Sequence, residues 1–188
     1  MAYIKNSSAA FTGASGQVAV MGELLQYQCN AAIPLVDVGT DVFAFRDDRE
    51  EVARIQVKTA TAKRYKNEEG YSARFSIPIA QLSRADAPPL FYALAVRLDD
   101  GWGSFVVISR TNLQQIRYDG VGTENPKSGN LELYIRFPPH REAVGTGDDE
   151  TQNDPDWRVL CGECDLTEYI NAWESLPPLK PKDFSPQA

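Results

Sequence analysis

The sequence predicts an α/β domain in which a helix and a series of strands are followed by a short helical end. Three features of the 188 residues support this fold class. An amphipathic stretch at residues 13–28 comes first, β-rich runs follow between residues 31 and 137, and a polar, acidic segment then separates these runs from the C-terminal end. We therefore expect a core at residues 1–137 and, at residues 138–188, an acidic linker with a C-terminal helix and a proline-rich tail.

The first element is predicted to be a helix from Gly13 to Gln28. The helical repeat is followed by Val18, Met21, Leu25 and Gln28, and Leu24 widens this apolar stripe, which is predicted to face the core. Ser15 is expected to cap the N-terminal end of this helix, because a serine side chain accepts hydrogen bonds from the first free main-chain N–H groups.

The middle of the chain predicts strands. The run at residues 90–98 is almost entirely apolar, which is typical of a strand buried on both faces. Thr111 is expected to cap a short helix that ends at Ile116. The strands are expected at residues 31–34, 41–46, 52–59, 71–78, 90–98, 104–109 and 131–137.

The C-terminal part has a different composition. Residues 142–156 are polar and acidic and predict a linker or loop. Asp165 and Glu168 resemble a capping box, and the apolar residues from Leu166 to Trp173 predict a short helix that packs back on the core.

The net charge of −7 arises in this C-terminal part. Residues 1–137 carry equal numbers of basic and acidic side chains, whereas residues 138–175 are strongly acidic. Within the neutral part, Val52–Lys66 holds five basic residues and no acidic one. Such a stretch is typical either of a solvated strand and loop face or of a surface that contacts nucleic acid.

Composition also excludes several classes of protein. The longest apolar runs are far shorter than the roughly 20 residues that cross a bilayer, and the first residues do not resemble a signal peptide. Three cysteines do not make a disulfide framework, so we expect a cytoplasmic protein with no membrane partner. Because His140 is the single histidine, the chemistry must rest on carboxylates, amides, lysines and hydroxyls.

The residues with the clearest chemical meaning lie on two neighbouring strands. Asp41 begins one strand, and Gln56 and Lys58 lie on the next. Side chains at alternate positions of a strand project from the same face, so Gln56 and Lys58 are expected to lie together beside Asp41. Carboxylate and amide oxygens are ligands for Mg²⁺, and a lysine beside them can stabilise charge during phosphodiester hydrolysis.

These residues resemble the PD-(D/E)XK nuclease superfamily, whose core is a helix, an Asp-bearing strand and a strand with Glu/Gln-x-Lys. The chain is most similar to its bacterial endonuclease-like and Holliday-junction-resolvase-like members, over about Gly13 to Arg110. The resemblance implies a restriction-endonuclease-like three-layer core at residues 1–137, with a central mixed β-sheet flanked by helices. The matching residues are Gly16-Gln17, Glu23-Leu24-Leu25, Ile33-Pro34, Asp41 and Gln56-Val57-Lys58-Thr59.

The resemblance implies a metal-dependent endonuclease that hydrolyses phosphodiester bonds in DNA, with Mg²⁺ or Mn²⁺ as the cofactor. By this analogy Asp41 and Gln56 hold the metal, and the main-chain carbonyl of Val57 is a third ligand. Lys58 assists the attacking water. Since related folds act as dimers, a homodimer is also expected.

Further residues are expected to help. On the first helix, Glu23 or Gln17 takes the place of the auxiliary acid of the superfamily. The expected partner is DNA, and its backbone is expected to contact the basic side chains of Arg54, Lys63, Arg64 and Lys66.

Three other interpretations stay open. Gln17 and Gln56 stand where carboxylates are usual, which favours a catalytically inactive module that binds nucleic acid or a protein. The acidic residues 148–156 also suit a regulatory segment that shields the basic surface or mimics DNA. Finally, Cys29, His140, Cys161 and Cys164 have the residue types of a zinc site.

Overall fold

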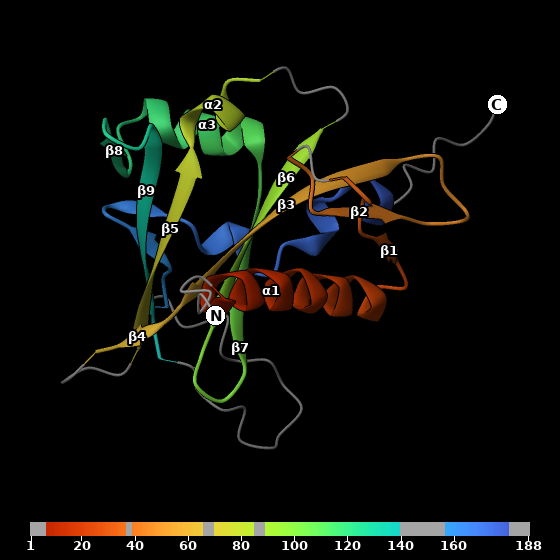
Figure 1. Ribbon diagram of the computed structural model, residues 1–188, viewed down its shortest axis with the longest axis horizontal. Helices are drawn as coiled ribbons and strands as arrows, with labels where there is room; N and C mark the ends of the chain where they lie inside the picture. The colour runs from red at the N-terminus through yellow and green to blue at the C-terminus, as the bar shows by residue number, and fades with distance from the viewer. Residues whose placement is uncertain (1–6, 37–38, 66–69, 85–88, 140–156, 181–188) are drawn as a thin grey trace, which may run out of the picture.

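A five-stranded mixed sheet forms the centre of the structure (Figure 1). The computed structural model describes residues 7–36, 39–65, 70–84, 89–139 and 157–180. In this first sheet β3 and β6 pair in parallel and every other neighbouring pair is antiparallel, so the predicted mixed sheet is confirmed. The order across it is β1 (Asn30–Ala32), β2 (Val42–Phe45), β3 (Val52–Thr61), β6 (Leu90–Arg97) and β7 (Trp102–Ser109).

A second, antiparallel sheet lies beside the first, and the chain passes from one to the other where β3 is followed at once by β4. Its central pair is β5 with β9, which match over eight residues from Tyr71 to Pro78. The strands of the second sheet are β4 (Lys63–Arg64), β5 (Tyr71–Pro78), β8 (Thr123–Asn125), β9 (Asn130–Phe137), β10 (Leu160–Cys161) and β11 (Cys164–Asp165).

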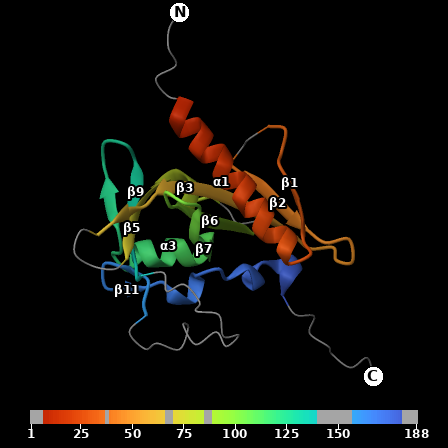
Figure 2. The same ribbon diagram turned by 90° about the horizontal axis from the view of Figure 1, so that it is seen from below.

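Helix α1 (Ser7–Gln26) lies across one face of the first sheet (Figure 2). It begins six residues earlier than predicted, so Ser15 is not its cap; the Ser15 hydroxyl instead donates to the carbonyl of Thr12 at 2.9 Å. The predicted core stripe is wrong for Val18 and Leu25, which are 64% and 62% exposed, and correct for Leu24, which is completely buried. The residues that face the sheet are Gly16, Val20 and Leu24, spaced four apart.

The shorter helices lie on the opposite face. Helix α2 (Ile79–Leu82) was not predicted, and α3 (Arg110–Tyr118) is longer than the predicted helix at residues 111–116. The cap of α3 is the Ser109 side chain, not Thr111; it accepts from the N–H of Asn112 at 3.1 Å. Among the residues that the structure describes, no helix is long and apolar enough to cross a membrane.

The C-terminal segment at residues 157–180 forms no α-helix, which corrects the predicted helical appendage. The Asp165 carboxylate accepts from the N–H of Thr167, but the helix does not continue, because Ile170 pairs with Val106 at the edge of the first sheet. An extended residue cannot be part of a helix. The segment contains three short 3₁₀ helices: η2 (Thr167–Tyr169), η3 (Trp173–Ser175) and η4 (Pro177–Leu179).

Two apolar clusters fill the two faces of the first sheet. One joins the sheet to α1 and to Trp173 and Leu176 of the C-terminal segment. The other joins it to the second sheet, α2 and α3. Helices were expected to flank the central sheet; α1 does so on one face, whereas on the other face the second sheet packs beside α2 and α3. The division of the chain at residue 137 stays a prediction.

Candidate active site

Asp41 precedes β2 and is almost completely buried, with 5% of its surface exposed. Its main-chain N–H donates to the carbonyl of Ile55 at 2.9 Å, so the pairing of β2 with β3 extends to this residue. Strand β1 pairs only with residues 43–45 of β2. The Asp41 carboxylate therefore lies at a place on the sheet that groups from both faces can reach.

Three donors surround the Asp41 carboxylate. Gln17 on α1 donates its Nε2 to Oδ1 at 3.1 Å, and the main-chain N–H of Val57 donates to Oδ2 at 2.7 Å. The Nε2 of Gln56 also donates to Oδ2. A buried carboxylate needs such donors, since an ionised group without them is costly in the interior. The structure thus brings together Asp41, Gln56, Val57 and Gln17, which the sequence predicted from distant positions.

Gln56 has one oxygen that these contacts do not use. The residue is 4% exposed, and within the described part of the chain its Oε1 is buried without a hydrogen-bond partner. A buried acceptor without a donor costs about 1–3 kcal/mol, so such atoms in native proteins call for an explanation. An amide oxygen next to a carboxylate is a donor set that hard cations bind.

The main-chain carbonyl of Val57 belongs to the same donor set. In a strand the N–H and C=O of one residue point toward the same neighbour, and the Val57 N–H points at Asp41. The residues around Asp41 therefore fit a divalent cation through one carboxylate, one amide and one main-chain oxygen. In the described ranges no three His, Cys, Asp or Glu side chains gather at one place, so such a site would carry a single carboxylate charge.

Lys58 lies two residues beyond Gln56 on β3, so both side chains project from the same face of the strand. Val57, between them, belongs to the cluster on the α1 side. Lys58 is half-buried, and no described carboxylate lies within ion-pair distance of its ammonium group. Its charge is therefore not neutralised by a described partner on this face.

Glu23 lies apart from this group. Six residues separate it from Gln17, which places the two side chains on different faces of α1. Partial burial raises the pKa of Glu23, and its charge contributes to the raised pKa of Tyr27, one turn further along. Of the two candidates on α1, Gln17 is therefore the one that contacts Asp41.

The basic residues that were expected to contact DNA lie in two separate regions of the structure. Arg54 lies on β3, on the same face as Gln56, and is half-buried. Lys63 and Arg64 are exposed on β4, and Lys63 lies seven positions beyond Gln56, about 23 Å for an extended chain at 3.3 Å per residue. Lys66 lies outside the described residues. The expected DNA contacts therefore do not form one patch at Asp41.

Two residues that sequence reasoning missed lie close to Gln56. Gln81 on α2 and Arg84 just after it approach Gly39, the residue two positions before Asp41. The four-residue α2 has no helical repeat that a sequence pattern could show. The sequence shows only the glycine at position 39. The structure explains it, because Gly39 has a φ of +96°, a backbone conformation that favours glycine.

The zinc interpretation is not supported. Cys161 and Cys164 lie opposite each other on β10 and β11, whereas Cys29 belongs to the apolar cluster on the other side of the molecule. Burial raises the pKa of Cys161 to about 11. His140 and the acidic residues 148–156 lie outside the described residues.

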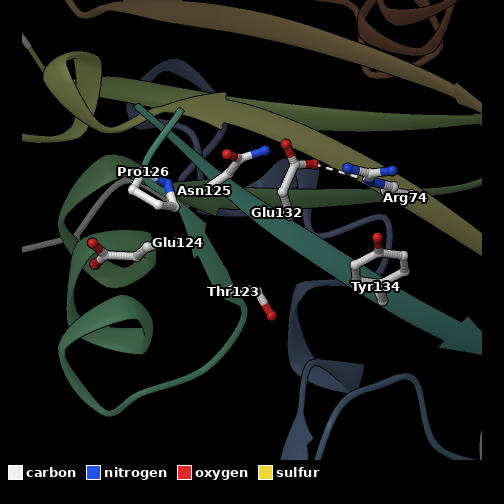
Figure 3. A pocket seen from close by; sticks show the side chains of 7 residues that line it. All are labelled: Arg74, Thr123, Glu124, Asn125, Pro126, Glu132 and Tyr134. Carbon is white, nitrogen blue, oxygen red and sulfur yellow. Dashed lines mark hydrogen bonds and ion pairs between the residues drawn. The ribbon is translucent and has the colours of Figure 1, made fainter. Parts of the chain in front are cut away.

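A polar hollow, about 350 Å³ in volume, lies on the outer face of the second sheet (Figure 3). Glu132 is buried there and accepts from Ser76 at 2.8 Å and from Arg74 at 3.1 Å. The Arg74 guanidinium lies 5.2 Å from the ring centre of Tyr134. Because these charges are already paired, the hollow offers no reactive group. It is lined by Arg74, Thr123, Glu124, Asn125, Pro126, Glu132 and Tyr134.

Comparison with known proteins finds similarity to solved structures. The chain is similar to a bacterial homing endonuclease, I-Ssp6803I, with a TM-score of 0.43 and 13% sequence identity over 87% of each chain. No family model matches the sequence, and no curated protein is similar to it. The functional argument therefore rests on the residues around Asp41.

Proposed function

We propose that this protein is a divalent-metal-dependent endonuclease that hydrolyses phosphodiester bonds in DNA. The observation that carries the proposal is the buried Asp41 carboxylate beside Gln56, whose Oε1 has no described partner, with Lys58 on the same strand face. Each of these residues has an ordinary structural explanation when taken alone. The contact of Asp41 with Gln56, together with a lysine two residues further along the same strand, supports the proposal beyond these separate explanations.

In this proposal the Asp41 carboxylate, Gln56 Oε1 and the Val57 carbonyl hold Mg²⁺ or Mn²⁺. When bound, such an ion polarises a phosphate oxygen and lowers the pKa of bound water. Gln17 keeps the Asp41 carboxylate in its orientation through the 3.1 Å hydrogen bond. Lys58 orients the attacking water and stabilises the negative charge that develops on the phosphate.

The first prediction tests the two charged residues. Asp41→Asn and Lys58→Met keep the shape of each side chain but remove its charge, and each is expected to lower cleavage at least about 100-fold. Nicking of supercoiled plasmid and cutting of branched DNA, with Mg²⁺, Mn²⁺ or EDTA, measure this directly. Lys127→Met is the matched control, because Lys127 is exposed on the turn before β9. The proposal is wrong if the wild-type protein cuts neither DNA, or if both variants cut as well as the wild type.

A second candidate is an inactive module on the same fold that binds nucleic acid or a protein. The observation that favours it is that Gln17 and Gln56, both neutral, already satisfy the Asp41 carboxylate. Calorimetric titration with Mn²⁺ separates the two candidates. Binding that is lost in Asp41→Asn supports the enzyme, whereas no binding at millimolar Mn²⁺ supports the module.

A further inference from the structure

Three polar side-chain atoms converge on the space beside Gly39, next to Gln56. A Cβ atom at Gly39 would lie 3.7 Å from Arg84 Nη1, 3.9 Å from Gln81 Nε2 and 4.0 Å from Gln56 Oε1. Since glycine has no Cβ, residue 39 leaves this space to other groups. A side chain from α2, one from the second residue after α2 and one from β3 therefore approach the same point beside Gly39.

The new groups at this point are hydrogen-bond donors. Arg84 presents a planar guanidinium, which matches the oxygens of a phosphate, and Gln81 presents an amide N–H₂ beside it. The Asp41 carboxylate accepts from three neutral donors and keeps its negative charge, which the cation of the proposed function would offset. The arrangement therefore favours an anionic group next to the cation ligands rather than a second cation.

The main chain of Gln81 is held in place by a buried arginine. Its main-chain carbonyl accepts from Nη1 of Arg110 at 3.5 Å, and Arg110 is 3% exposed. Within the described chain the side-chain Oε1 of Gln81 is buried without a partner. A phosphodiester has no hydrogen to donate to this oxygen, so the group that Gln81 presents to an anion is its amide N–H₂.

We propose that Arg84, with Gln81 beside it, binds a phosphate group of the DNA strand at the Asp41 site. The inference rests on the proposed function, because a DNA backbone is the anionic substrate of that function. It adds two binding residues that the motif around Asp41 does not contain. In this proposal the end of α2 binds the DNA strand, while Lys58 assists hydrolysis of its phosphodiester bond.

The test measures binding separately from cleavage. A fluorescent duplex is titrated in the Asp41→Asn background, so that DNA is bound but not cut, at salt concentrations from 50 to 200 mM, on the order of those that reveal phosphate contacts. Arg84→Ala is expected to weaken binding about tenfold, since hydrogen bonds to charged groups are the strong ones. The slope of log Kobs against log salt is expected to fall by about one, the signature of one lost phosphate contact.

Two further variants separate charge from geometry. Arg84→Lys keeps the charge and is expected to keep the salt slope while losing part of the affinity. Gln81→Met, a neutral replacement, is expected to weaken binding without a change of slope. Arg158→Ala is the control, because Arg158 is an exposed arginine on the C-terminal segment.

The outcomes distinguish the two proposals. If Asp41→Asn binds DNA and Arg84→Ala leaves both affinity and slope unchanged, the role of Arg84 is wrong while the proposed function stands. If the wild-type protein neither binds nor cuts DNA, both proposals fall. Arg84 is exposed, so its variants are expected to fold, and an unchanged thermal unfolding curve verifies this.

Discussion

At the scale of single residues, the site depends on one carboxylate among amides. Asp41 accepts hydrogen bonds from Gln17, Gln56 and the main chain of Val57, and none of these donors carries a charge. A second carboxylate at position 56 would repel Asp41 until a cation lies between them. Glutamine at this position avoids that repulsion when no cation is present, and it offers the proposed cation a neutral ligand.

This reasoning predicts the behaviour of Gln56→Glu. In EDTA the added buried charge is expected to lower stability by about 1–3 kcal/mol, in the range of buried unpaired groups. Added Mn²⁺ is expected to raise the melting temperature of the variant more than that of the wild type, because the ion bridges two carboxylates. Thermal unfolding with and without Mn²⁺ measures both effects. Gln26→Glu, exposed at the end of α1, should show no metal response, and an equal response in the two variants contradicts the proposed site.

At the scale of elements, the contact of α1 with β3 positions Gln17. A Cβ atom at Gly16 would lie 1.9 Å from Oγ1 of Thr59, so the helix approaches the strand more closely than any other residue would allow. Gln17 follows directly and reaches Asp41 from this helix. The hydrogen bond therefore depends on a glycine that has no polar chemistry of its own.

Gly16→Ala is expected to push α1 away from β3. The overpacking should cost about 1–3 kcal/mol, although alanine is the better helix former. Gly22→Ala is the matched control on the same helix, because no atom lies within 4 Å of its added methyl group. It is expected to gain about 0.5–1 kcal/mol. Urea unfolding of the two variants measures the difference, and equal stability would show that the contact is not close in solution.

A second substitution, at Thr59, is expected to restore part of the stability that Gly16→Ala loses. Combining Gly16→Ala with Thr59→Ala removes the oxygen that the new methyl group meets, so part of the lost stability should return. A double-mutant cycle isolates this coupling from the effect of each substitution alone. No coupling in the cycle would place the cost of Gly16→Ala elsewhere on the helix.

At the scale of the whole molecule, the C-terminal segment is part of the core rather than an addition to it. Trp173 is completely buried, and its ring centre lies 5.5 Å from that of Phe105 on β7. Val159 and Leu166 of the same segment belong to the cluster on the other face of the first sheet. Residues 157–180 therefore contribute to both clusters, and the first sheet is not fully covered without them.

Trp173→Ala is expected to destabilise the whole fold and not only the C-terminal segment. Removing a fully buried tryptophan costs about 3–5 kcal/mol, from lost burial and from the cavity left behind. A single cooperative urea transition at lower denaturant is the expected result. Tyr118→Ala, at an exposed position on α3, is expected to change stability little. Independent melting of the C-terminal segment, with an unchanged main transition, would contradict a shared core.

Much of this fold was predictable because its signals are local. The strand at residues 71–78 was predicted with its observed bounds, since buried and exposed positions alternate along it. The continuous apolar run from Leu90 also predicted a strand correctly, because β6 is covered on both faces. The predicted C-terminal helix was wrong because the deciding contact is not local. Ile170 pairs with Val106, which is far away in the sequence, and this pairing overrides the local helical pattern.

In the candidate site, too, some contacts were predictable from local sequence and others were not. A carboxylate before one strand and a Gln-x-Lys on its hairpin partner meet through local pairing, so the sequence by itself placed Asp41 beside Gln56. Which residue of α1 reaches Asp41 depends on how the helix lies on the sheet, and there only the tertiary structure separated Gln17 from Glu23. The approach of Gln81 and Arg84 to Gly39 was likewise decided by packing, because α2 comes from another part of the chain. Strand pairing across a short turn is encoded in neighbouring residues, whereas contacts between layers arise only when the apolar clusters bring distant segments together.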